Sequence, residues 1–163
     1  MANRLTRALG RLKFLPSPLH RSVRSRMIGR AVPFVGTAGV SFDEIRPGLV
    51  TVSIANRRRV RNHIGSVHAV AMTLLAEGAT GFVVAMSIPD DKVPVVKSLT
   101  VQFVRRASGA LTATATLTHE DIARIERDEK GEIRVPVQVL DETGAEPITV
   151  EAVWAWSPKR RPA

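Results

Sequence analysis

The stretch from Asn62 to Gly81, NHIGSVHAVAMTLLAEGATG, is almost wholly apolar and carries one carboxylate, Glu77, in its middle. A helix that is apolar nearly all round has to be enclosed by other parts of the fold. Ser66 is a candidate N-cap, so we expect a helix from about residue 66 to residue 86. A lone acid in such a helix is costly unless it is solvated, paired or protonated, and it therefore asks for a functional explanation.

Stretches of strict apolar–polar alternation surround this helix and predict half-buried strands. They cover residues 50–54, 99–103, 111–117, 133–139 and 148–156. Pro136 inside one of them indicates an edge position or a bulge. The charged residues 119–132 predict a short helical turn. The sequence thus predicts an α+β fold in which an antiparallel sheet curls around one central helix.

The N-terminal 42 residues differ in charge from the rest of the chain. They hold eight basic residues and no acidic one, whereas residues 43–163 hold 16 basic and 15 acidic side chains. We expect a basic helical arm over 1–42, with helices at 3–14 and 17–29 and a loop at 36–39, followed by one domain over 43–163. The arm is either a solvated pair of Arg-rich helices or a contact for nucleic acid, an anionic membrane or a phosphorylated ligand.

Composition narrows the function classes. The chain has no Cys, and its four His are scattered, so we expect no metal and no cofactor. Aromatic residues make up only 4%, which argues against base stacking and a nucleic-acid partner. No signal-peptide core is evident, and His68 and Glu77 interrupt the longest apolar run, so we expect a cytoplasmic protein without a membrane span. The acid-free, Arg-rich start is also typical of a mitochondrial transit peptide.

Two groups of polar residues belong to the central helix. Thr73, Glu77 and Thr80 follow a spacing that places them on one stripe, which has to face a ligand, a partner subunit or trapped water. Burial would raise the pKa of Glu77 and suit it to act as a general base or nucleophile, although a purely structural Glu is an equal alternative. Asn62 and Gly65 lead into the helix N-terminus, where free N–H groups can hold a carbonyl oxygen or simply form a capping turn.

Three motifs together carry a resemblance to a known family. N-x-x-G-S-x-H-A-V at 62–70, L-A-E at 75–77 and the strand VKSLTVQFVRRASG at 96–109 resemble hotdog-fold acyl-CoA thioesterases over roughly residues 45–156. Within this superfamily, the chain most resembles a branch labelled as a domain of unknown function. That branch includes tetrameric acyl-CoA thioesterases and is related to the thioesterases of the phenylacetate pathway. The resemblance implies a hotdog fold, an acyl-CoA substrate and a homodimer or homotetramer with each active site across the subunit interface.

The resemblance also implies roles for individual residues. Glu77 would activate water or attack the thioester, the Ala69 N–H would polarise the carbonyl, and Asn62 would orient substrate or water beside His68. Where the family has Gly-Gly this chain has Ala69-Val70, which keeps the backbone N–H but narrows the space above it. Further candidate substrate contacts are Gly65, Val70, Thr73, Thr80, Arg58, Arg61, Arg105 and Arg106, the arginines toward the phosphates of coenzyme A. Arg57 and Arg59 are candidates for the same phosphates, and a solvated loop is an equal alternative for the basic run 57–61.

The resemblance leaves two functions open. The chain is either a hydrolase of acyl-CoA or a related thioester, or a non-catalytic hotdog that binds acyl-CoA or a fatty acid in the same groove. The Ala-Val departure motivates the second interpretation. Membrane contact through the N-terminal arm is a minor alternative.

Overall fold

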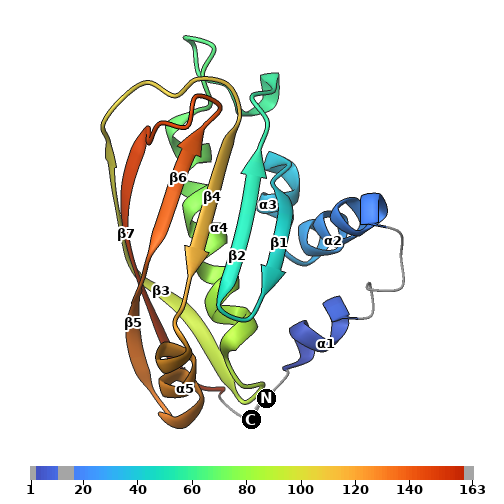
Figure 1. Cartoon of the computed structure of the whole chain (residues 1–163), viewed down its shortest axis with the longest axis vertical. Helices are drawn as coiled ribbons and strands as arrows, with labels where there is room; N and C mark the ends of the chain where they lie inside the picture. The colour runs from blue at the N-terminus through green and yellow to red at the C-terminus, as the bar shows by residue number, and fades with distance from the viewer. Residues whose placement is uncertain (1–2, 11–16, 160–163) are drawn as a thin grey trace.

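The computed structural model describes residues 3–10 and 17–159. Its helices are α1 (Arg4–Gly10), α2 (Ser17–Ala31), α3 (Pro33–Ala38), α4 (Ala69–Ser87) and α5 (His119–Arg127). Its strands are β1 (Ser41–Arg46), β2 (Leu49–Ile54), β3 (Lys92–Phe103), β4 (Leu111–Thr116), β5 (Gly131–Val135), β6 (Val137–Asp141) and β7 (Ile148–Pro158). Figure 1 shows the long helix α4 held within a curved layer of strands, with α1, α2 and α3 to one side.

The strands form two antiparallel sheets that together wrap α4. One sheet has the order β1-β2-β4-β6 and the other the order β3-β7-β5. Pro136 alone separates β5 from β6, and the chain changes sheet there, because proline cannot continue a ladder of hydrogen bonds. The predicted single strand 133–139 is therefore two strands, and the edge position that Pro136 indicated is confirmed, since β5 and β6 each lie at the edge of a sheet.

The core of the wrap is the contact between α4 and the strands. Leu75, Ala76 and Ala79 are completely buried, as are Val50, Val52 and the other inward residues of β2 and β4. A Cβ at Gly81 would lie 2.7 Å from the Trp154 ring, so this position needs glycine to admit the indole of β7. The predicted central helix and surrounding strands are confirmed, and β1, which the sequence did not predict, is an additional strand.

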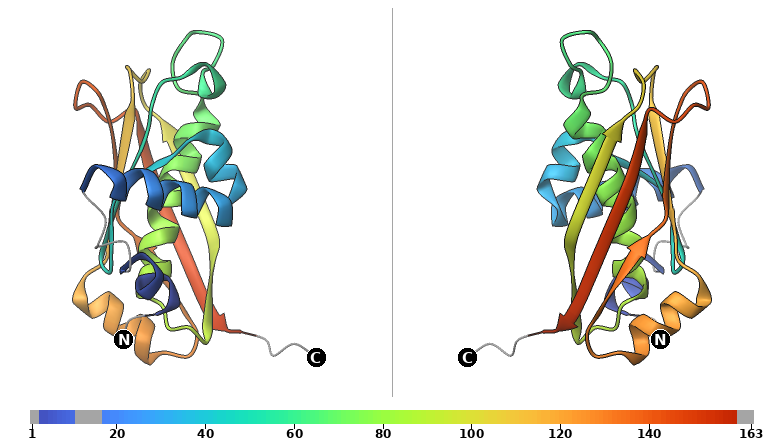
Figure 2. Two further views of the ribbon diagram at one scale, coloured as in Figure 1. Left: turned by 90° about the vertical axis from the view of Figure 1, so that its right-hand side faces the viewer. Right: turned by 90° about the vertical axis from the view of Figure 1, so that its left-hand side faces the viewer.

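The helices α2 and α3 lie against the outer edge of β1 and the open side of α4. Arg24 of α2 donates to the carbonyls of Phe42 and Asp43, and Ser25 accepts from the Phe42 N–H at 2.9 Å, which covers the free edge of β1. The left view of Figure 2 shows these helices crossing α4 on the side that the sheet leaves open.

The segment 36–39, expected to be a loop, belongs largely to α3. Pro33 occupies the first turn of α3, where its missing N–H costs nothing, and Gly39 ends the helix in the left-handed region with φ of 73°. Gly36 meets Gly29 of α2 so closely that a Cβ at position 36 would lie 2.6 Å from the Gly29 carbonyl oxygen. The glycines therefore serve helix packing and helix termination.

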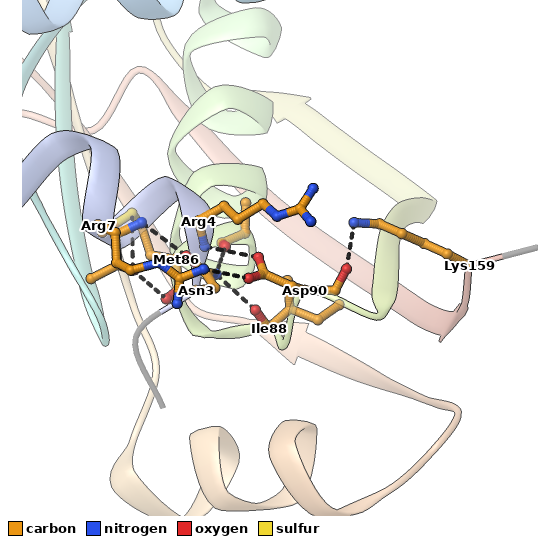
Figure 3. Close-up of polar contacts among 9 residues, drawn as sticks. Asn3, Arg4, Arg7, Met86, Ile88, Asp90 and Lys159 are labelled. Carbon is orange, nitrogen blue, oxygen red and sulfur yellow. Dashed lines mark hydrogen bonds and ion pairs between the residues drawn. The ribbon is translucent and has the colours of Figure 1, made fainter.

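The helix α1 closes the C-terminal end of α4, as Figure 3 shows. The buried Asn3 donates through Nδ2 to the carbonyls of Ala85 and Ile88, each at 2.7 Å, and accepts from the Thr6 N–H through Oδ1. Asp90 accepts from the Arg4 N–H and from the Arg7 guanidinium, which lower its pKa, the Arg4 N–H contributing most. The predicted first helix is confirmed over Arg4–Gly10, and positions 11–14 of that prediction lie outside the described residues.

Candidate functional site

The N-terminus of α4 is shaped by a tight loop over residues 61–68. Asn62 accepts through Oδ1 from the N–H groups of Ile64 and Ser66, both at 3.1 Å, and Gly65 takes φ of +81°. The Nδ2 group of Asn62 donates to no described residue, so it stays available as a donor. The loop forms a turn around Asn62, and the amide of Asn62 serves this turn through its oxygen only.

His68, not Ser66, is the N-cap of α4, and the helix begins at Ala69. The Nδ1 atom of His68 accepts from the Val70 N–H at 3.1 Å, which places the proton of a neutral ring on the exposed Nε2. The predicted cap was wrong because the side chain of Ser66 accepts from Arg106 instead. His68 therefore presents an N–H donor beside the start of the helix.

The Ala69 N–H is a free donor at this helix start. The backbone N–H groups of Ala71 and Met72 both donate to the His68 carbonyl, and Val70 is capped by the His68 ring. No described group accepts from Ala69. Its N–H adds to the partial positive charge at the N-terminus of α4 and can hold a developing oxyanion.

Glu77 lies two turns further along α4, half-buried on the side that the strands leave open. It lines a small hollow of about 140 Å³ with Val32 and Val35 of the α2–α3 region and with Phe82 and Trp154. Burial raises the pKa of its carboxyl, and no described side chain donates to it or pairs with it. A carboxylate without a partner in apolar surroundings is a suitable proton acceptor.

The predicted polar stripe holds for two of its three members. Thr73 is half-buried and donates to the Ala69 carbonyl at 3.1 Å, on the side of Glu77. Thr80 points elsewhere: it is fully buried, donates to carbonyls of its own helix and accepts from the Trp154 indole at 3.0 Å. Its hydroxyl satisfies a buried indole of the core, which the spacing along the helix could not reveal.

The candidate arginines divide into two groups. Arg61 donates to the Asn56 side chain and carbonyl, and Arg106 donates to Ser66 and to the Ile64 carbonyl, so both hold the loop before α4. Arg58 and Arg105 are exposed, and their guanidinium groups contact no described acceptor.

The structure adds a groove that the sequence analysis did not predict. A groove of about 380 Å³ lies between α3 and the first turns of α4, and Phe34, Arg59, His68 and Val70 are among its lining residues. Arg59, His68 and Val70 were candidates from the sequence, whereas Phe34 was not, because α3 was not predicted as a helix. Among the described residues no group of three His, Asp or Glu side chains could hold a metal ion.

α4 is the one described helix whose length and composition would also suit a membrane crossing. Its residues are mostly enclosed by the strands, as the right view of Figure 2 shows, so these properties reflect its place in the core.

Comparisons with known proteins agree with this architecture. The family model described as "Domain of unknown function (DUF4442)" matches residues 20–156. The chain belongs to the DUF4442 family. Among curated proteins none matches this DUF4442 chain.

Solved structures with the same architecture include several thioesterases. A Pseudomonas aeruginosa protein of unknown function, described as a probable thioesterase, shares 27% identity with a TM-score of 0.77 over 89% of this chain and 97% of its own. A Staphylococcus aureus thioesterase shares 20% identity with a TM-score of 0.64 over 77% of this chain and 99% of its own. A Haemophilus influenzae thioesterase shares 15% identity with a TM-score of 0.61 over 77% of this chain and 82% of its own. The predicted hotdog fold and the predicted resemblance to a branch of unknown function among hotdog-fold thioesterases are confirmed.

Proposed function

We propose that this protein hydrolyses acyl-CoA or a related acyl thioester, with Glu77 as general base and the Ala69 N–H as oxyanion donor, in active sites shared by two copies of the chain. The observation that carries the proposal is the half-buried carboxylate of Glu77, which has no described partner and lies on the open side of the same helix that begins at the free Ala69 N–H. These two groups supply the proton acceptor and the electrophilic assistance that ester hydrolysis requires.

The spacing of the two groups favours a site built from two subunits. Ala69 and Glu77 are eight residues apart on α4, which at about 1.5 Å per residue separates them by about 12 Å along the helix axis. A general base and an oxyanion donor each have to lie about 3 Å from the reacting atoms. Two copies of α4 running antiparallel, with a twofold axis near Thr73, would bring Ala69 of one copy toward Glu77 of the other.

The edge strand β3 offers the surface on which a second copy could pair. β3 ends its sheet, and apolar side chains lie exposed along it and just beyond it. They are Val93, Val95, Val96, Phe103 and Val104, with exposed fractions of 38–56%. A long edge with exposed apolar side chains is a template for pairing with another strand, so a β3–β3 contact between two copies would join their sheets.

The proposed reaction proceeds by attack of water. Glu77 removes a proton from a water molecule as the water oxygen forms a bond to the thioester carbonyl carbon. The negative charge that develops on the carbonyl oxygen is held by the Ala69 N–H and the positive end of α4. The tetrahedral intermediate then expels the thiolate, which takes the proton back from Glu77, and the carboxylic acid is released. Direct attack by Glu77 would instead form an anhydride, which hydroxylamine would trap.

Neighbouring residues fit supporting roles. The free Nδ2 group of Asn62 and the Nε2–H of His68 are donors for the water or the thioester. Gly65 lies between them in the loop and has no side chain that would block access of the substrate to these donors. The exposed Arg58 and Arg105 are candidates for the phosphates of coenzyme A. Arg61 and Arg106 act by holding the loop, and Thr80 supports the core behind the site.

One detail of a related structure supports the pair Asn62 and Glu77. The Staphylococcus aureus protein has been crystallised as variants in which a glutamine and a glutamate, fifteen residues apart, are replaced by alanine. Asn62 and Glu77 have the same spacing in this chain. The proposal assigns the amide and the acid of this chain to one site on the basis of that spacing and their exposure.

The test is a thiol-release assay with acyl-CoAs from propionyl to hexadecanoyl, comparing the wild-type protein with Glu77→Gln. We expect release by the wild-type protein and a loss of about 10²-fold or more in Glu77→Gln, as for removal of a general base. Unchanged release in Glu77→Gln would refute the role of Glu77. Binding of acyl-CoA without any thiol release by the wild-type protein would favour the non-catalytic acyl-CoA-binding alternative.

A further inference from the structure

The groove between α3 and α4 is an apolar site beside the proposed oxyanion donor. Phe34, Thr37 and Ala38 of α3 form one wall, and Val70, Ala71 and Leu74 of α4 form the other. Its volume is about 380 Å³, within the range typical of small-molecule sites. His68 and Val70, which flank the Ala69 N–H in the chain, both line it, so the groove starts where the thioester carbonyl would sit.

The position of α3 over this groove is fixed by its packing. Val35 is buried to 2% exposure, and the close approach of Gly36 to Gly29 locks α3 onto α2. On the same short helix, Phe34 remains 61% exposed at the groove. An exposed phenyl ring on a rigid support gains free energy when an apolar ligand covers it.

The charge near the groove complements an anionic head group. Arg59 lines the groove, packs against Gly39 and forms no ion pair with any described residue. Arg57 and Arg58 precede it and are exposed. An apolar groove next to unpaired guanidinium groups suits a molecule with an apolar tail and phosphates at the other end.

Building on the proposed function, we propose that the acyl group of the thioester lies in this groove and that α3 sets the length of acyl chain the protein accepts. At about 30 Å³ for each water-sized group, the groove has room for about a dozen such groups at most. This size selects medium-length acyl chains over short ones, because each additional buried methylene adds binding free energy.

The test fills the groove from its exposed rim. Thr37 is exposed, so Thr37→Trp places an indole in the groove without disturbing the core. Leu19→Trp on α2, where Leu19 is 51% exposed, is the matched control. Thiol release is measured with propionyl-CoA and dodecanoyl-CoA, and binding of dodecanoyl-CoA is measured by calorimetry in a Glu77→Gln background.

We expect Thr37→Trp to lower kcat/KM for dodecanoyl-CoA about tenfold or more, since about two buried methylenes correspond to a tenfold change. The same variant should leave propionyl-CoA turnover within about twofold, and Leu19→Trp should change neither. Equal effects of Thr37→Trp on both substrates, or none on either, would overturn the assignment of the groove.

The binding measurement separates this inference from the proposed function. If the wild-type protein releases no thiol but dodecanoyl-CoA binds and Thr37→Trp weakens that binding about tenfold, the groove assignment stands and the hydrolase proposal fails. If thiol is released and neither the turnover nor the binding of dodecanoyl-CoA responds to Thr37→Trp, the hydrolase proposal stands and the groove assignment fails.

Discussion

Glu77 is held in surroundings that work against its charge, and this has a consequence for activity. Burial raises the pKa of its carboxyl above the ordinary value of 4.5. A general base acts in its charged form, so we expect kcat/KM to fall as the pH decreases through the raised pKa of Glu77. The measurement is kcat/KM for thiol release as a function of pH, with an acyl-CoA that saturates the enzyme. A decrease in kcat/KM that begins only at or below pH 4.5 would contradict the prediction.

The same raised pKa predicts a cost in stability. Between the unfolded pKa and the raised folded pKa, the folded protein binds more protons than the unfolded chain, so the free energy of unfolding decreases as the pH rises through that interval. Glu77→Gln removes the charge, and we expect its Tm at pH 7 to exceed that of the wild-type protein. The difference in Tm should disappear below about pH 4, where Glu77 of the wild-type protein is protonated in both the folded and the unfolded state. Equal Tm values at pH 7 would contradict the prediction.

Ala69 offers a way to remove a backbone donor without removing a side chain. Ala69 is the first residue of α4, where proline is tolerated, and the extended backbone of His68, with ψ of 144°, suits a residue before proline. We expect Ala69→Pro to lower kcat about 10²–10³-fold, as for loss of one oxyanion donor. Ala69→Gly keeps the N–H and is the control; a similar loss in both variants would assign the effect to shape.

The elements that were hardest to predict are those governed by tertiary contacts. Residues 36–39 were predicted as a loop because of their two glycines, yet 36–38 belong to α3, where Gly36 serves the close contact with Gly29 of α2. β1 lacks clean alternation because a bulge between Phe42 and Glu44 shifts its register. The central helix and most strands were predictable, because each buries one regular face.

The candidate site was predictable in part for the same reason. The spacing of Ala69 and Glu77 on one helix is a property of the sequence, and the structure leaves both groups without described partners. Spacing alone could not separate Thr73 from Thr80, because the partner of Thr80 is an indole from β7 that lies 74 residues away in the chain.

The side chain of Asn3 makes two of the hydrogen bonds that join the α1 end of the chain to the C-terminal end of α4. Asn3 donates to two carbonyls at the C-terminal end of α4 and accepts from α1 through Oδ1 (Figure 3). We expect Asn3→Ala to lower the free energy of unfolding by about 1–3 kcal/mol, since buried carbonyls lose their donor. Urea unfolding measures this.

The control for that prediction is Arg4→Ala, which should change stability by less than about 0.5 kcal/mol because Arg4 binds Asp90 through its backbone N–H. Asn3→Asp keeps the acceptor for Thr6 but loses the donor, so it should destabilise the protein at least as much as Asn3→Ala. Wild-type stability in Asn3→Asp would show that the α4 carbonyls do not depend on Asn3.

At the scale of the whole molecule, the exposed apolar edge of β3 predicts self-association. A charge placed on an edge strand opposes pairing with another strand. Val95 is 52% exposed, so Val95→Lys should leave the fold intact while shifting the protein from dimer to monomer and reducing thiol release. Sedimentation velocity and the release assay check both effects; a monomeric wild-type protein with full activity would contradict the shared site.

The sharpest test of a shared site mixes two inactive chains. If the Ala69 N–H of one copy works with Glu77 of the other, a dimer of one Glu77→Gln chain and one Ala69→Pro chain contains one intact site and one site with both defects. Random reassociation makes half of the dimers hybrid, so the mixture should recover about a quarter of the wild-type activity. If both groups served a site within one chain, every site would carry one defect and mixing would recover nothing. The recovery therefore depends on where the two groups meet, which no single variant reveals.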